Sequence, residues 1–302
     1  MNTKRNSSHD DGSFSRCAAD RSRTGFTLAE LLVVIATLAV LAALVLPALA
    51  GTRPNSQLLQ CLNNQKKLAT AWLMYAPDND DRVVGFNTVT MNLDWRKGAA
   101  SGAGTVTGLK VAPPAGLSGE PLFDWSIQEG YREEPLYKYA PNPLLIHCPG
   151  DKRISPGGTT YYYDSYSGVE GLNGGNYVPG SGNSGSEHNA TPIMKSSGLR
   201  HPNQRFLWVE ENDIRGDNQG SWWFDPGSPF GSNLRLIDCP AVYHFTGSTF
   251  SFADGHSESR PWGQDGNTIS LGLAGFSYPV AIPNPNSDLR YIAAGYPCVE
   301  NP

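Results

Sequence analysis

The sequence predicts an α+β protein in which a long N-terminal α-helix packs on an antiparallel β-sheet head with long loops. Three observations predict this fold. Residues 31–50 form an uncharged apolar run, residues 56–75 carry apolar side chains at helical spacing, and residues 79–302 alternate short apolar or aromatic segments with turn residues. With 33 glycines, 23 prolines and only 17% charged residues, the composition favours strands and loops over a helical bundle.

The apolar run has the length that an α-helix needs to cross the hydrocarbon of a bilayer, about 20 residues. We therefore expect a transmembrane helix over residues 26–50, preceded by a leader over residues 1–25. Arg16, Arg21 and Arg23 form a basic flank. This flank predicts a cytoplasmic leader, a single-pass protein of the bacterial inner membrane and a periplasmic head. An ordinary secretory signal is the alternative, because Ala48-Leu49-Ala50 matches a small-residue cleavage site.

A short motif lies directly before the apolar run, where residues 23–32 read RTGFTLAELL. This segment strongly resembles the processing site of type IV prepilins and type II secretion pseudopilins. The resemblance implies that a prepilin peptidase cuts after Gly25 and methylates Phe26 as the new first residue. Counted from Phe26, the family's glutamate at the fifth position falls on Glu30, and its proline at the twenty-second falls on Pro47.

The resemblance also implies roles for these residues. A carboxylate beside a membrane helix is costly and usually has a partner. In pilin filaments the partner is the N-terminal amine of a neighbouring subunit, so Glu30 would fix the stagger between subunits. The alternative is that Glu30 only marks the edge of the span at the headgroup level. Pro47 removes one helical hydrogen bond and is expected to kink the helix.

Residues 51–78 are expected to continue the helix as an amphipathic segment, although Gly51 and Pro54 predict a break or a bend. Lys66 and Lys67 belong to its solvated face. The side chains predicted to contact the sheet are Leu58, Leu62, Ala69 and Trp72. The sequence CLNNQKKL at residues 61–68 resembles sequences of a pseudopilin group of planctomycetes and verrucomicrobia. In that group this stretch joins the long helix to the head.

The head is predicted over residues 79–302, with strand candidates at 144–147, 161–166, 206–209, 221–224 and 249–253. Near its end, His244 is followed by nine residues and then by Asp254 and Gly255. This spacing resembles a signature of the same prepilin group. Because Asp254 and Gly255 both tolerate positive φ, they predict a hairpin turn. His244 is predicted to be a hydrogen-bonded sheet residue and not a catalyst.

The cysteines indicate disulfide bonds. Cys17 falls in the leader, which leaves four cysteines without a metal-type C-x-x-C pair. An even set of this kind favours disulfides in an oxidising compartment. We expect Cys61 to pair with Cys148 and Cys239 with Cys298, although sequence alone does not fix the connectivity.

Other kinds of site find little support. A net charge of −5 argues against a phosphate-binding surface, so no nucleic acid partner is expected. The sequence holds no nucleophile elbow, Walker lysine loop or H-E-x-x-H motif, and its histidines are too scattered to indicate zinc, so no enzymatic activity is expected. Calcium is the one cofactor considered, against the alternative of a solvated acidic loop. Its candidate ligands are Glu210, Glu211, Asp213 and Asp217.

Taken together, the resemblance implies a pseudopilin subunit of a type II secretion-type filament. Its implied partners are the prepilin peptidase-methyltransferase, other pseudopilin subunits and an inner-membrane secretion platform. A type IV pilin or minor pilin is an alternative within the same class. A second class is an anchored binding protein for a polysaccharide or another exported substrate. Its aromatic segments would be residues 161–163 and 222–224.

Overall fold

The computed structural model describes residues 26–50, 52–86, 94–98, 105–153, 162–173, 193–214, 220–225, 235–263, 267–274, 280–281 and 287–297, without the side chains of residues 44–50, 52–55, 225, 235, 267, 274, 280 and 281. The chain forms two compact units, Met1–Ala50 and Gly51–Pro302. The first contains helix α1 (Leu28–Ala50), and the second begins with helix α2 (Thr52–Asp78).

The N-terminal region corrects two predictions. Helix α1 ends at Ala50 and helix α2 begins at Thr52, in the region where the sequence predicts a break or a bend. Crossing a bilayer requires about 20 apolar residues in one helix. Among the residues that the structure describes, no helix meets this requirement for length and apolar character. The predicted membrane-spanning N-terminal helix and the predicted single-pass location in the inner membrane are therefore wrong.

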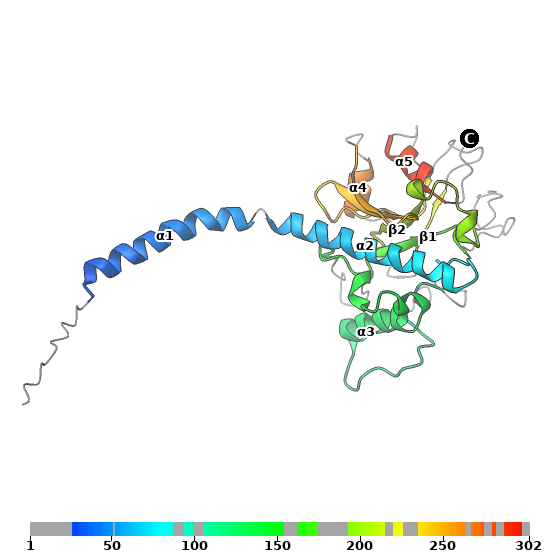
Figure 1. Ribbon diagram of the computed structural model, residues 1–302, viewed down its shortest axis with the longest axis horizontal. Helices are drawn as coiled ribbons and strands as arrows, with labels where there is room; N and C mark the ends of the chain where they lie inside the picture. Colours follow the sequence, from blue (N-terminus) through cyan, green and yellow to red (C-terminus); the bar gives the residue numbers. More distant parts are fainter. Residues whose placement is uncertain are drawn as a thin grey trace, which may run out of the picture. The chain divides into compact units, whose positions relative to one another are not determined.

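Helix α2 lies along the sheet of the second unit and contacts strands β6 and β7 (Figure 1). Ala69 and Trp72 are buried as predicted, while Leu58 and Leu62 are half-buried. Gln65 is also buried, because its side-chain amide donates hydrogen bonds to the carbonyl and the hydroxyl of Thr249 in β6. A polar residue is thus part of the face that α2 presents to the sheet.

The main sheet has five strands in the order β3-β1-β2-β6-β7. Their bounds are Tyr166–Val169 for β1, Phe206–Glu210 for β2, Ser221–Trp222 for β3, Gly247–Phe252 for β6 and Ser257–Pro261 for β7. The pairs β1–β2, β2–β6 and β6–β7 are antiparallel, but β1 and β3 run parallel. The sheet is therefore mixed and not antiparallel as predicted. A smaller antiparallel sheet contains β4 (Phe224–Asp225), β5 (Arg235–Leu236) and β8 (Val280–Ala281).

Helices cover both faces of the main sheet (Figure 1). One core lies on the face of the sheet that α2 covers, and it includes Trp72, Trp95 and Trp208. The other core lies against α5 (Ser287–Gly295), where Phe206 and Phe250 pack near Leu289. Every residue of β2 is buried, as expected of a strand covered on both faces.

Shorter helices complete the second unit. They are α3 (Gly119–Arg132), α4 (Asn267–Ala274) and the 3₁₀ turns η1 (Pro135–Lys138), η2 (Pro143–Ile146), η3 (Ser196–Gly198) and η4 (Pro202–Gln204). Turn η2 contacts both α2 and α3. The segment that follows η2 carries Cys148 and reaches the buried end of β2.

Candidate functional site

Helix α1 begins with a reciprocal pair of hydrogen bonds between Thr27 and Glu30. The Thr27 amide and hydroxyl donate to Oε2 of Glu30 at 2.9 and 2.7 Å, and the Glu30 amide donates to the Thr27 hydroxyl at 3.2 Å. This is a capping box, which satisfies backbone donors that a helix leaves free at its start. The hydrogen bonds from Thr27 lower the pKa of Glu30, so the carboxylate is ionised at neutral pH.

The described part of α1 exposes large apolar side chains. They are Leu28, Leu31, Leu32, Val33, Val34, Ile35, Leu38, Val40 and Leu41. Five of them are consecutive, and successive residues are rotated by about 100° around a helix, so these side chains cover its whole circumference. Phe26 is 72% exposed just before the helix. Gly25 and the side chain of Pro47, both predicted to act here, lie outside the described residues.

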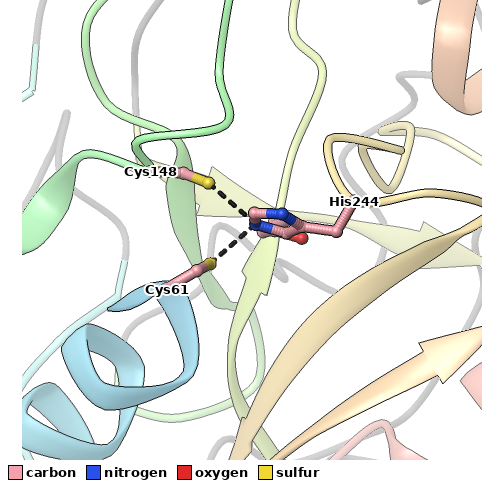
Figure 2. Close-up of side chains that lie close together, drawn as sticks. Cys61, Cys148 and His244 are labelled. Atoms are coloured by element: carbon pink, nitrogen blue, oxygen red, sulfur yellow. Dashed lines mark hydrogen bonds and ion pairs between the residues drawn. The ribbon is translucent and has the colours of Figure 1, made fainter. Parts of the chain in front are cut away.

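The second unit contains a buried cluster of four side chains that we call the Cys-Glu-His cluster: Cys61, Cys148, Glu210 and His244. Cys61 comes from α2, Cys148 from the segment after η2, Glu210 from the end of β2 and His244 from the segment before β6. Figure 2 shows the side chains of Cys61, Cys148 and His244 pointing toward one another. All four residues are at most 4% exposed.

The distances within the cluster are short. Sγ of Cys61 lies 2.8 Å from Oε1 of Glu210, and Sγ of Cys148 lies 3.1 Å from Nε2 of His244. The same Nε2 lies 3.2 Å from Oε1 of Glu210. One ligand-type atom from each residue lies within 4.8 Å of the other three. The four groups therefore share one small space.

Hydrogen-bond donors surround the cluster. The Tyr166 hydroxyl donates to Sγ of Cys61 at 3.0 Å, and the Gly150 amide donates to Sγ of Cys148 at 3.3 Å. The Thr249 amide donates to Oε2 of Glu210 at 2.8 Å, which leaves Oε1 facing the cysteines and His244. Gly150 also lies so close to His244 that a Cβ at this position would stand 2.7 Å from Cε1 of the ring.

Burial and mutual contact shift the pKa values in the cluster. Burial raises the pKa of Cys61 well above its usual value, and the neighbouring Cys148 and Glu210 raise it further. Burial raises the pKa of Tyr166 in the same way. For His244, burial lowers the pKa, but hydrogen bonds to Cys148 and Glu210 outweigh burial and raise it to about 10. In the chain alone, Cys61 is therefore a neutral thiol and His244 a cation beside Glu210.

The thiols of Cys61, Cys148 and Cys239 are free in the structure, where the sequence analysis expects disulfide bonds. Cys61 and Cys148 do lie side by side, but as members of the cluster. Cys239 is buried elsewhere, with its Sγ 3.5 Å from the Pro240 carbonyl. Cys298 lies outside the described residues.

Among the described residues, the predicted calcium ligand Glu210 lies apart from Glu211 and Asp213. Glu210 belongs to the cluster, whereas Glu211 and Asp213 line a separate cavity of about 220 Å³. Adjacent residues at the end of a strand point to opposite faces, which separates Glu210 from Glu211. Glu170 lines the same cavity, and burial together with the nearby Asp238 raises its pKa to about 8. Asp217 lies outside the described residues.

The remaining predicted site residues lie in the β6–β7 hairpin or in the hydrophobic core. Asp254 and Gly255 form the turn between β6 and β7, and Gly255 has a φ of +93°, so the predicted hairpin is present. His244 bridges to Gly247 at the start of the same hairpin. The rings of Trp222 and Phe224 are fully buried in the second core. These two rings are not available to stack on a bound sugar.

Sequence reasoning weighed all four residues of the cluster, but in three separate roles. The sequence predicts a disulfide for Cys61 and Cys148, a calcium site for Glu210 and a position in the sheet for His244. Metal sites are recognisable in a sequence when their ligands are closely spaced, as in C-x-x-C pairs. Here each ligand-type residue comes from a different segment, and only the fold brings them together.

In comparisons with known proteins, no family model, curated protein or solved structure matches this chain.

Proposed function

We propose that this protein is a pseudopilin-type filament subunit that is cut between Gly25 and Phe26 and assembles with other pseudopilin subunits through α1. The observation that carries the proposal is the start of α1. There a capped, ionised Glu30 precedes a helix that exposes apolar side chains on all sides. The resemblance of residues 23–32 to the prepilin processing motif supports the same function.

The apolar surface of α1 supports assembly through this helix. Exposed apolar surface costs about 25 cal/mol per Å² in water, so a helix that is apolar all round is expected to be buried by something. Helices of the same kind from neighbouring subunits are suited to this role, because each would bury the other's leucine and valine side chains. Packing of this kind makes a continuous apolar filament core.

Glu30 supports the proposed register between subunits. Cutting after Gly25 would create a positively charged amine on Phe26, four residues before Glu30. Thr27 occupies Oε2 of Glu30, but a carboxylate accepts up to about four hydrogen bonds and has capacity for a further donor. Within an apolar filament core, an amine from a neighbouring subunit would be strongly attracted to this carboxylate.

Intact-mass measurement of the mature chain tests the proposal. The full-length protein is co-expressed with an active prepilin peptidase, and the expected product begins at an N-methylated Phe26. Gly25→Leu is the matched control, since a bulky side chain beside the cut bond should block processing. If the wild-type leader stays intact while the peptidase processes another prepilin, or if the chain is cut after Ala50 instead, the proposal fails.

A further inference from the structure

We propose that Cys61, Cys148, Glu210 and His244 bind one structural zinc ion inside the second unit. This inference goes beyond the proposed filament function and does not depend on it. The four side chains are buried, come from four segments and direct a ligand-type atom into one space, as Figure 2 shows for three of them.

The residue types fit zinc. Thiolate, imidazole and carboxylate groups are its protein ligands, and structural sites have four of them in a tetrahedron. Two soft sulfur ligands with one imidazole favour zinc over calcium or magnesium, which prefer sets of oxygen ligands. With four protein ligands and no exposed position, the site would be closed, as in structural zinc sites and unlike catalytic ones.

The spacing of the ligand atoms also fits. Zinc bonds of about 2.0 to 2.3 Å place tetrahedral ligand atoms about 3.3 to 3.8 Å apart. Two separations are close to this range. Nε2 of His244 lies 3.1 Å from Sγ of Cys148 and 3.2 Å from Oε1 of Glu210. All the ligand atoms lie within 4.8 Å of one another. The Cys61 Sγ to Glu210 Oε1 contact is the shortest at 2.8 Å, so side-chain rotations that move the ligand atoms by up to about 1 Å would complete the tetrahedron.

The surroundings resemble the outer shell of a metal site. When zinc binds, Cys61 and Cys148 act as thiolates and His244 as a neutral imidazole, so the site releases protons, including the one on the His244 imidazolium. Two thiolates and one carboxylate then give the filled site a net charge of −1. Tyr166, Gly150 and Thr249 each direct a donor at one of these three ligands from outside. Donors in such positions stabilise negative ligand atoms and hold their orientation.

A further bond orients Thr249. The Gln65 side-chain amide donates to the Thr249 hydroxyl at 2.9 Å. That hydroxyl is then able to donate its own hydrogen to Sγ of Cys61, 3.1 Å away. Zinc would thus join α2, the segment after η2, strand β2 and the segment before β6 inside the second unit.

Metal analysis of the purified full-length protein tests the proposal. After refolding with zinc and dialysis against a weak chelator, we expect about one zinc per chain, as for tight structural sites. Cys148→Ser should lose most of this zinc. Cys239→Ser is the matched control, because Cys239 is equally buried and lies outside the cluster, and it should keep the wild-type content. Equal zinc content in both variants would overturn the proposal, as would a zinc-free wild type.

Two measurements on the wild-type protein cover the case in which Cys148→Ser fails to fold. Replacing zinc by cobalt should give the sulfur-to-cobalt charge-transfer absorption of a tetrahedral site with thiolate ligands. Mass spectrometry of the protein alkylated under denaturing, non-reducing conditions should find Cys61 and Cys148 as free thiols. A protein that gives no such absorption, or that carries a Cys61–Cys148 disulfide when isolated, would contradict the proposal.

Discussion

Nε2 of His244 lies 3.1 Å from Sγ of Cys148, although the two residues are 96 positions apart in the chain. The contact joins the β6 hairpin to the segment after η2. It forms part of a cluster that Cys61 connects to α2 and Glu210 connects to β2. The cluster is thus a cross-link between the helix layer and the sheet, and its state should affect the stability of the whole second unit.

Zinc removal should lower this stability. A ligand that binds only the folded state stabilises it by about 2.7 kcal/mol at a concentration 100 times its Kd. We therefore expect a strong chelator to lower the Tm of the wild-type protein by several degrees, and added zinc to restore it. The measurement is thermal unfolding followed by circular dichroism. In Cys148→Ser the chelator should change the Tm little. If the chelator also leaves the Tm of the wild-type protein unchanged, the prediction is contradicted.

Gly150→Ala should disturb the cluster through His244. The new Cβ would stand 2.7 Å from Cε1 of the ring and 3.2 Å from the Tyr243 carbonyl oxygen, so the ring has to move. Overpacking of this kind costs about 1 to 3 kcal/mol, and we expect a lower free energy of unfolding together with weaker zinc binding. Urea unfolding and zinc titration measure the two effects.

Gly198→Ala is the control for this substitution, because its Cβ would meet only Cγ2 of Ile193 at an ordinary 3.8 Å. It lies in η3, away from the cluster, and should leave zinc binding unchanged. Equal effects of the two substitutions would show that His244 is not sensitive to its contact with Gly150.

Tyr166→Phe removes one hydrogen bond to Cys61 without removing a ligand. Outer-shell substitutions at metal sites typically reduce affinity about 10- to 100-fold, and we expect an effect near the lower end because the ring still fills its place. Competition with a chromophoric chelator measures the affinity. An unchanged affinity would mean that the Tyr166 hydroxyl does not support the thiolate.

Local sequence patterns predicted those parts of the fold that depend on neighbours along the chain. The spacing of Ala69 and Trp72 placed both on the buried face of α2, and Asp254-Gly255 indicated the β6–β7 turn. Helical periodicity does not predict that Gln65 is buried. Gln65 is buried because its side chain donates hydrogen bonds to Thr249, which lies 184 positions away in the sequence. The parallel pairing of β1 with β3 likewise depends on a distant segment.

The candidate sites show the same difference between features that depend on neighbouring residues and features that depend on distant segments. Residues 27–30 contain their capping box within one helical turn, so the polar start of α1 is local information. The Cys-Glu-His cluster needs four segments to meet, and no spacing in the sequence encodes that meeting. An even number of cysteines therefore led to a prediction of disulfides, whereas the fold surrounds two of the thiols with His244 and Glu210.

Stability should decrease as pH rises because of Glu170. Its pKa is about 8 in the folded protein, raised by burial and by Asp238, against an ordinary value of 4.5. Below pH 4.5 both the folded and the unfolded state hold the proton. Between the two values only the folded state holds it, so raising the pH favours unfolding by up to about 1.4 kcal/mol per pH unit. The cavity around Glu170 also presents Arg153, Asp164 and Glu211.

Glu170→Gln isolates this effect, because a neutral amide of similar size has no proton to lose. Urea unfolding at pH 5, 6, 7, 8 and 9 should show the wild-type free energy of unfolding falling relative to that of the variant. The difference between the two proteins should level off above the folded pKa. Parallel pH profiles would mean that Glu170 is already ionised in the folded protein at neutral pH.

Two substitutions at Glu30 distinguish the role of its charge from the role of its hydrogen bonds to Thr27. Glu30→Gln keeps the capping box, since glutamine also serves at this position, but it removes the negative charge. Glu30→Ala removes both, and losing a helix cap costs about 1 kcal/mol. If Glu30 pairs with the amine of a neighbouring Phe26, both variants should assemble at least about tenfold less than the wild type, a loss of about 1.4 kcal/mol or more per contact.

Chemical cross-linking of subunits in native cells measures this assembly, with N-terminal processing checked in parallel so that a failure to cut is not mistaken for a failure to assemble. Thr27→Ala is the matched control, because it removes the hydroxyl that forms the cap with Glu30 and leaves the charge of Glu30 in place. Assembly should then rank wild type, Thr27→Ala, and last the two Glu30 variants. If Glu30→Gln assembles as well as the wild type while Thr27→Ala and Glu30→Ala both fail, the carboxylate acts only as a helix cap and not as the partner of an amine.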